Sequence, residues 1–226
     1  MSTTATIEIE STRASTAIAA RIAALAGAAF ALCFFVGVAM LEIPKAATDR
    51  ELVAWWSDGG NQTAAILSMY LFVVAGICLL VFLAGLRSRL LAFEGGRGDL
   101  TALVFGSGVV FVAMLFVAAV ARGVIAFAAR SPVGGEPLPG ADTLRYLPQI
   151  GYAATGTGGM LAAALTIATA SWLILRTGAF GRWLAWVGGL AALVVVGATA
   201  ALSAVLAIPA VLVWALAASV ALWRAG

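Results

Sequence analysis

The sequence lacks histidine altogether and contains one lysine and two cysteines. Without histidine, imidazole ligation of haem, most catalytic zinc sites and Ser-His-Asp chemistry are excluded. Lys45 stands in a polar loop, so it cannot form a retinal Schiff base inside a helix bundle. Cys33 and Cys78 each lie midway along an apolar stretch, without the spacing of a metal or redox motif, and we interpret them as packing residues. We therefore predict no cofactor and no metal.

Charge is also scarce, at 10% of the residues against about 25% in soluble globular domains. Five stretches carry no charge, and each is long enough to cross a hydrocarbon core of about 30 Å as a helix. These stretches are 22–41, 59–86, 100–121, 146–175 and 183–223. They do not alternate in polarity as transmembrane β-strands do. Because a backbone in lipid must satisfy its own hydrogen bonds, the predicted fold class is all-α, a polytopic transmembrane helix bundle.

The longest uncharged stretch, 183–223, decides the number of spans. As one helix it would be about 60 Å long, roughly twice the thickness of the core. Pro209 suits the first turn of a returning helix, so we predict a helical hairpin with its turn near 201–208. Six spans is the favoured count, and five with a re-entrant segment is the alternative. The predicted spans are 18–41, 63–86, 100–128, 149–175, 183–201 and 208–223.

The chain is predicted to have a mobile cytoplasmic tail, 1–16, and a single six-helix transmembrane domain, 17–226. Basic residues accumulate on the cytoplasmic side of membrane proteins. With the N-terminus inside, that side holds Arg13, Arg21, Arg87, Arg89, Arg97, Arg176, Arg182 and Arg224. The other side holds Lys45, Arg50, Arg122, Arg130 and Arg145. This bias favours both termini in the cytoplasm and accounts for the net charge of +3 without a nucleic-acid partner.

Two longer loops are predicted on the outer side, each with a short helix. The segment TDRELVAWWSDGGN offers an N-cap at Thr48 or Asp49 and stops at its Gly-Gly pair. We expect Trp55 and Trp56 in this helix to be interfacial, at the level of the lipid headgroups. The segment GADTLRYLPQ repeats the pattern and is predicted to stop at Pro148.

Four segments resemble a group of six-span membrane proteins of high-GC, actinobacterial-type bacteria. They are ELVAWWSDGGNQ after the first span, LAGLRSRL at the end of the second, LRYLPQIGYA before the fourth and LRTGAFGRWLAWVGG before the final hairpin. The resemblance covers nearly the whole chain after Arg21. It implies a multi-pass protein of the bacterial cytoplasmic membrane, and it carries over no activity and no catalytic residue.

Arg122 is the one charge embedded in a clearly apolar segment, FVAMLFVAAVARGVIAFAAR. Charges within the membrane are costly and indicate a functional site by default. The alternative is that Arg122 lies close enough to the outer end of its span to extend to the interface. For the functional interpretation the best partner is Glu42, at the end of the first span. Such a pair would close the outer mouth of the bundle or bind an anionic headgroup.

The fourth span opens with PQIGYAATGTGGM, which supplies the other candidate site. Gln149, Tyr152, Thr155 and Thr157 are the one cluster of polar side chains near a predicted cavity. Thr155, Gly159 and Ala163 follow a small-xxx-small pattern that permits close helix packing in lipid. The glycines also allow a partly unwound stretch that exposes carbonyls to a ligand, and close packing is the alternative.

The charge-free stretches contain no Asp, Glu, Lys or His, which argues against an intramembrane enzyme and against an ion-coupled pump. Two hypotheses remain. The first is a protein that binds a membrane lipid, an apolar small molecule or another membrane protein, including a second copy of itself. The second is a small passive transporter or channel in which Arg122 lines a path for anions or headgroups.

Overall fold

The computed structural model describes residues 3–40, 43–44, 48–95, 98–131, 135 and 137–225, with backbone alone for 3–16, 204 and 205. Every regular element in these ranges is helical, which confirms the all-α fold class. The elements are α1 (Thr3–Ala39), α2 (Asp49–Ser57), α3 (Gly59–Phe93), α4 (Asp99–Ala129), α5 (Ala141–Ala153), the π-helix η1 (Ala154–Gly159), α6 (Met160–Thr177), α7 (Arg182–Ala200) and α8 (Ala204–Ala225).

Six helical segments in the described ranges are long and apolar enough to cross a membrane, in agreement with the favoured count. They are Ala17–Ala39, Gly59–Phe93, Asp99–Ala129, Ala141–Thr177, Arg182–Ala200 and Leu206–Ala225. The fourth of these combines α5, η1 and α6 into one continuous helical unit. The chain is therefore a multi-pass helical membrane protein by length and composition of its helices.

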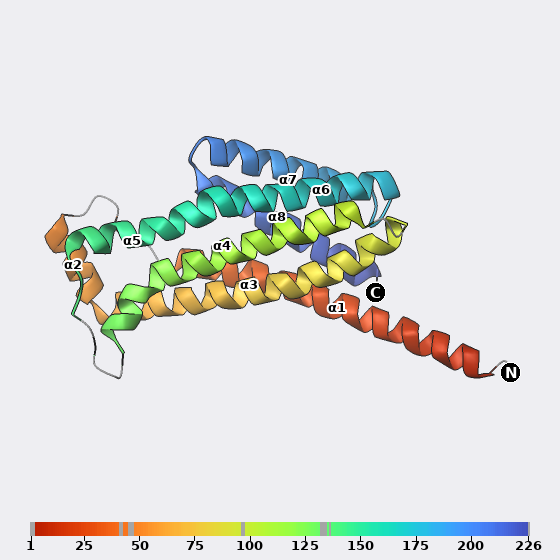
Figure 1. Ribbon diagram of the computed structural model, residues 1–226, viewed down its shortest axis with the longest axis horizontal. Helices are drawn as coiled ribbons and strands as arrows, with labels where there is room; N and C mark the ends of the chain where they lie inside the picture. Colours follow the sequence, from red (N-terminus) through yellow and green to blue (C-terminus); the bar gives the residue numbers. More distant parts are fainter. Residues whose placement is uncertain are drawn as a thin grey trace.

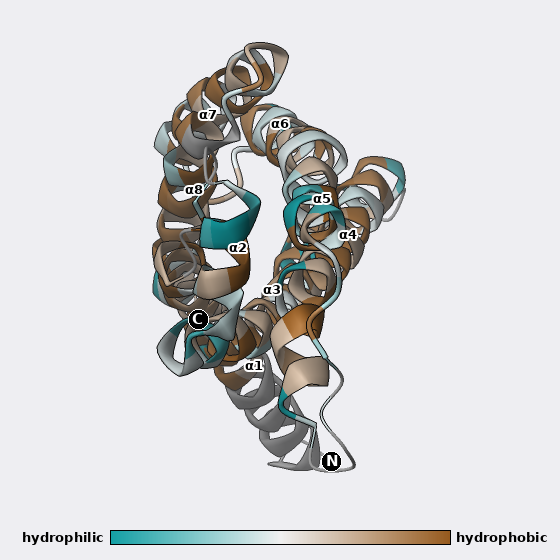
Figure 2. Cartoon of the chain, turned by 90° about the vertical axis from the view of Figure 1, so that its left-hand side faces the viewer, coloured by the Kyte–Doolittle hydropathy of each residue, from teal (hydrophilic) through white to brown (hydrophobic). Residues whose placement is uncertain are grey.

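The spans form a closed ring of neighbours in the order α1, α3, α4, α6, α7 and α8, with α8 packing back onto α1. Figure 1 shows α2 and the start of α5 together at one end of the bundle, which we call the capped end. The α3–α4 and α6–α7 connections lie at the opposite end, with the start of α1 and the end of α8. We call this the basic end. Figure 2 shows hydrophobic spans and hydrophilic segments in α2 and α5.

Local capping explains where the helices at the capped end begin. Thr48 and Glu51 form a capping box at the start of α2, as the predicted N-cap at Thr48 requires. The Asp58 side chain accepts a hydrogen bond from the Asn61 amide, 2.9 Å away, at the start of α3. Since these caps follow each other closely, the chain turns from α2 directly into α3.

The final hairpin is confirmed as two long helices, but its turn differs from the prediction. The chain turns over residues 201–203, and Leu202 adopts a left-handed φ of 53°. The amide of Ser203 donates to the carbonyl of Ala198, which closes the turn tightly. Consequently α8 begins earlier than expected, and Pro209 lies inside α8 rather than in its first turn. With 19 and 22 residues, α7 and α8 are about 28 and 33 Å long, enough for two full crossings.

Helix α1 starts at Thr3 and so includes most of the segment 1–16, whose mobility and cytoplasmic location stay predictions. One further prediction differs from the observed helices, because Pro148 lies inside α5 instead of ending it. Proline removes one helical hydrogen bond but does not oblige the helix to end when the neighbouring residues are well packed. Both Pro148 and Gly151 are buried against the bundle, so the fourth span continues through them.

Candidate functional site

Arg122 lies in the interior of the bundle, seven residues before the end of α4 and therefore about 10 Å from that end. Its side chain is 4% exposed. The guanidinium carbon lies 4.8 Å from the centre of the Phe72 ring on α3 and 5.0 Å from that of Tyr152 on α5. Such distances are within the range of cation–π contacts. The structure places this charge between helices and not on the lipid-facing surface.

Glycines allow the neighbouring helices to approach α4 closely around Arg122. A Cβ atom at Gly151 of α5 would lie 3.1 Å from the Ala118 carbonyl oxygen and 3.1 Å from Cγ of Arg122. A Cβ atom at Gly123 would lie 2.6 Å from the Met69 side chain of α3. The backbone of α5 therefore packs directly against the aliphatic part of Arg122. The two rings are not the only contacts of this arginine.

The predicted partner of Arg122, Glu42, lies outside the described residues. Its neighbour Ile43 is described, and it packs against a cluster of buried side chains at the capped end. That cluster contains Ile125 and Ala126, about one turn of α4 beyond Arg122. The chain beside Glu42 thus passes this part of α4, and the Arg122–Glu42 pair stays a prediction.

The structure brings one member of the predicted polar cluster to Arg122 and separates the others. Tyr152 is half-buried and contacts the guanidinium. Thr155 is half-buried, and its hydroxyl oxygen has no hydrogen bond within the described part of the chain. Gln149 and Thr157 are exposed, and the Thr157 hydroxyl donates back to the carbonyl of Ala153. The four side chains therefore do not form a single site.

The glycine-rich stretch of the fourth span is a π-helix, η1, rather than an unwound segment. Short π-helices are rare and frequently occur at functional sites. Here Gly159 is buried, and a Cβ atom there would lie 3.3 Å from Cβ of Met114 and 3.4 Å from the Phe111 ring, both on α4. Ala163, one turn further, is buried too. These contacts are the close packing that the small-xxx-small pattern predicts.

The two tryptophans of α2 do not share the expected interfacial position. Trp56 is completely buried, in the cluster that also contains Leu52 of α2 and Leu144 of α5. Trp55 is half-buried, with its ring centre 4.9 Å from that of Trp56. The prediction for Trp56 is wrong because α2 folds back over the bundle and uses this indole as its main apolar anchor. Hydropathy does not distinguish an anchor from a headgroup contact.

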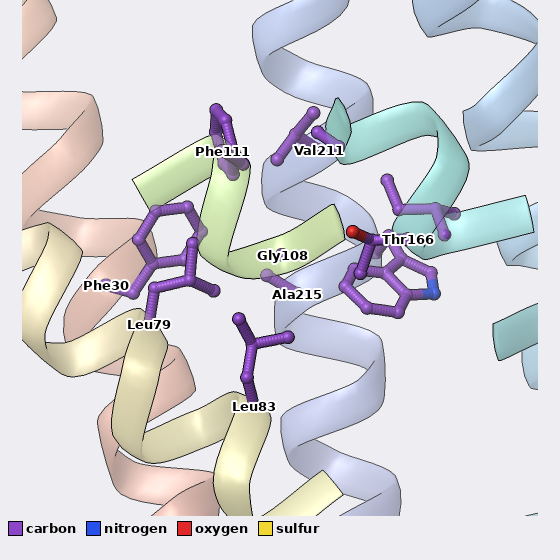
Figure 3. Close-up of a pocket in the computed structure, with 11 residues that line it drawn as sticks. Phe30, Leu79, Leu83, Gly108, Phe111, Thr166, Val211 and Ala215 are labelled. Atoms are coloured by element: carbon purple, nitrogen blue, oxygen red, sulfur yellow. The ribbon is translucent and has the colours of Figure 1, made fainter. Parts of the chain in front are cut away.

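A small cavity of about 20 Å³ lies in the interior of the bundle. Three aromatic side chains line it, those of Phe30, Phe111 and Trp214. Figure 3 shows Leu79, Leu83, Val211 and Thr166 around the same space. The Thr166 hydroxyl lies 2.8 Å from the hydroxyl of Ser107, so its hydrogen bonding is satisfied. This volume corresponds to about one water molecule. The core is closed at this level.

A larger pocket, of about 340 Å³, lies at the basic end, and the sequence pattern did not reveal it. Arg89 of α3 and Arg224 of α8 line it together with three aromatic rings, those of Phe93, Phe180 and Trp183. Phe180 precedes Gly181 in the α6–α7 turn, and both have positive φ values, 57° and 84°. This turn brings the Phe180 ring to 6.5 Å from the ring of Phe93.

The two arginines of this pocket make no hydrogen bond, ion pair or ring contact with a described residue. The described residues contain one ion pair, between Arg145 and Asp49 at the capped end, with 2.7 Å between the guanidinium nitrogen and the carboxylate oxygen. Other arginines of the basic end lie over rings, Arg21 over Trp223 and Arg87 over Phe105. Two guanidinium groups that face one pocket without an acidic partner favour an anionic ligand, because each presents a fork of N–H donors.

The described residues contain no group of three or more His, Cys, Asp or Glu side chains placed to hold a metal ion. We compared the chain with protein-family models, curated proteins and solved structures, and none of the three comparisons gave a match. The fold therefore defines the class of protein, a multi-pass helical membrane protein, and the pockets are the basis for proposing what it does.

Proposed function

We propose that this chain is a lipid-binding protein of the bacterial cytoplasmic membrane, and that its basic end takes an anionic headgroup between Arg89 and Arg224. The observation that carries the proposal is the pocket of about 340 Å³ in which these two arginines face three aromatic rings without an acidic partner among the described residues. Guanidinium groups bind phosphate oxygens in a bidentate manner, and aromatic rings commonly lie at headgroup level.

The distribution of charge supports a cytoplasmic basic end, with both termini inside. The described part of this end holds Arg13, Arg21, Arg87, Arg89, Arg176, Arg182 and Arg224, against Glu8, Glu10, Glu94 and Asp99. The described part of the capped end holds Arg50, Arg130 and Arg145, against Asp49, Glu51, Asp58 and Asp142. This is the asymmetry that the positive-inside rule describes. The cytoplasmic leaflet also carries the anionic lipids that attract such residues, by about 1 kcal/mol per Lys or Arg.

The phosphate that this pocket fits could come from a lipid or from a soluble phosphate ester. The lipid is favoured because the rings beside the arginines are partly uncovered, Phe93 by 51% and Trp183 by 45%. An acylated glycerol would cover this apolar surface, whereas inorganic phosphate would leave it bare. The other ligands considered from the sequence were an apolar small molecule and another membrane protein. The same experiment would detect either of them bound in this pocket.

The test is retention of phosphatidylglycerol by the purified, delipidated protein, measured by native mass spectrometry from nanodiscs. At about 1 kcal/mol per arginine, the double variant R89Q/R224Q should weaken retention by about tenfold or more. Arg182 is exposed at the same end and lines none of the pockets described, so R182Q is the matched control. Equal losses in R182Q and in the double variant would refute the proposal. Displacement of the lipid by millimolar inorganic phosphate would instead indicate a soluble ligand.

The alternative function is a small passive transporter or channel with Arg122 on the path of an anion or headgroup. The burial of a charge inside the bundle favours it. The rings packed on that charge and the closed core count against it. Anion flux from proteoliposomes distinguishes the two functions, since only a transporter would lose flux in R122Q.

A further inference from the structure

A second cavity lies at the basic end, between the α3–α4 connection and the end of α6, and its volume is about 400 Å³. Its polar lining differs from that of the Arg89–Arg224 pocket, because it combines one basic residue with two acidic ones. The lining residues with polar side chains are Glu94, Asp99, Arg176 and Thr177. The apolar part of the lining includes the Trp172 ring of α6.

Of the two acids, Glu94 already has a structural role. Its carboxylate accepts hydrogen bonds from the amides of Leu100 and Thr101, at 3.0 and 3.1 Å, and so caps the start of α4. Asp99 and Arg176, in contrast, are exposed and make no hydrogen bond or ion pair with any described residue, including each other. One carboxylate and one guanidinium therefore line the same cavity with their charges available. The complementary ligand carries one cation and one anion.

An apolar groove continues from this cavity along the lipid-facing side of α6 and α7. It has a volume of about 520 Å³, and Trp172 lines both the groove and the cavity. Along α6 the groove reaches from Leu175 to Leu161, about 21 Å at 1.5 Å per residue. This length exceeds half of a hydrocarbon core of about 30 Å. The groove can thus hold an acyl chain that starts at the basic end and runs to the middle of the bilayer.

We propose that this composite site binds a zwitterionic aminophospholipid of the bilayer. The ammonium group lies at Asp99, the phosphate lies at Arg176, and one acyl chain follows the groove between α6 and α7. Trp172 sits where headgroup and chain meet, as tryptophans at membrane interfaces do. The site shares the Phe93 ring with the Arg89–Arg224 pocket, but its charged residues and its class of lipid are different. It therefore goes beyond the proposed function and does not depend on it.

The structure offers a substitution that blocks the groove without disturbing the core. Gly189 of α7 lines the groove, and a Cβ atom there would meet no atom within 4 Å. Gly106 of α4 has the same open surroundings but lines no cavity described here. Leucine at Gly189 should therefore obstruct the acyl chain, whereas leucine at Gly106 is the matched control for added bulk on an exposed helix face.

The experiment uses the full chain in nanodiscs that contain equal amounts of phosphatidylethanolamine, phosphatidylcholine and phosphatidylglycerol. Lipids retained after release are identified by native mass spectrometry. We expect wild-type protein to retain phosphatidylethanolamine in preference to phosphatidylcholine, whose quaternary ammonium has no N–H to donate to Asp99. Both D99N and G189L should reduce retention of phosphatidylethanolamine about fivefold or more, and G106L should leave it unchanged.

Each outcome bears on the proposal. Unchanged retention in D99N, or equal retention of phosphatidylcholine by the wild type, would overturn it. A dimer that G189L dissociates would also overturn it, because a second copy of the chain would then occupy the groove. Retention of phosphatidylglycerol tests the Arg89–Arg224 pocket separately. If R89Q/R224Q loses phosphatidylglycerol and retains phosphatidylethanolamine, the two sites bind lipid independently. Thermal unfolding of D99N and G189L at the wild-type midpoint confirms that the variants are folded.

Discussion

The guanidinium carbon of Arg122 on α4 lies 4.8 Å from the centre of the Phe72 ring on α3, inside the bundle. The ring of Tyr152 on α5 contacts the same group from the fourth span. A single buried cation thus joins three spans close to the capped end. Phe72 in turn packs edge-on against Phe34 of α1, with ring centres 5.5 Å apart, so the contact extends into the aromatic core.

Replacing Arg122 by alanine should therefore destabilise the protein. A desolvated cation–π contact contributes about 2 kcal/mol, so we expect R122A to lower the free energy of unfolding by at least about that amount. For a chain of this size, the midpoint of thermal unfolding should fall by roughly 4–8 °C. The measurement is tryptophan fluorescence in mild detergent, with the exposed Arg182 replaced by alanine as control. If both variants unfold at the same temperature, the ring contacts do not stabilise the bundle.

The ring and the hydroxyl of Tyr152 should both contribute to its contact with Arg122, because the guanidinium lies over the ring and the tyrosine side chain also hydrogen-bonds to it. We expect Y152F to lose only part of this stabilisation, because the ring that faces the guanidinium is kept. Y152L should lose about half of the stabilisation that R122A loses, since Phe72 stays in place. The same thermal unfolding assay measures both. A larger loss in Y152F than in Y152L would assign the contribution to the hydroxyl.

The predicted Arg122–Glu42 pair can be tested although Glu42 lies outside the described residues. Directly coupled groups give interaction energies of about 0.5–3 kcal/mol in double-mutant cycles. We expect E42Q and R122Q to be non-additive within this range when their unfolding free energies are compared with that of the double variant. Additive effects would show that Glu42 does not interact directly with Arg122. Asp58, which caps α3 at the same end, provides D58N as a control that should be additive.

The span architecture followed from the sequence because its signals are local. The length of 183–223 favoured two crossings, and the N-cap candidates Thr48 and Asp49 marked the start of α2. Burial of Arg122 was not predictable in the same way. The rings that cover it belong to Phe72 and Tyr152, which are distant in sequence, and only packing of the spans brings them together.

The Arg89–Arg224 pocket could not be predicted from the sequence for a related reason. Its residues come from α3, the α6–α7 turn and α8, and each arginine by itself is what the positive-inside rule expects at a helix end. Trp56 was misplaced because a buried anchor and an interfacial indole have the same hydropathy. Apolar patterning therefore predicted which segments are helices but not which side chains face each other.

The capping box of α2 should make the capped end sensitive to acid. Hydrogen bonds from the backbone amide and the hydroxyl of Thr48, at 2.8 and 2.9 Å, lower the pKa of the Glu51 carboxyl below its ordinary value. A carboxyl with a lowered pKa in the folded state stabilises above its ordinary pKa. This stabilisation is lost as the pH falls through the lowered value. After correction for the intrinsic exchange rate, we expect the protection of the α2 amides to fall below about pH 4, and E51Q should remove this loss of protection. Equal pH profiles of wild type and E51Q would contradict the capping role.

Close packing of α1 against α3 gives a prediction about a single methyl group. A Cβ atom at Gly85 of α3 would lie 2.2 Å from Cβ of Ala23 on α1, and this methyl group cannot rotate away. G85A should therefore push the two helices apart and cost about 1–3 kcal/mol, as overpacking in a core does. Gly106 of α4 has no atom within 4 Å of the corresponding position, so G106A should be nearly neutral. Thermal unfolding of both variants in the same detergent measures the difference. Because A23G restores the missing space, the double variant A23G/G85A should recover part of the stability, and failure to recover would show that α1 and α3 do not meet at this point.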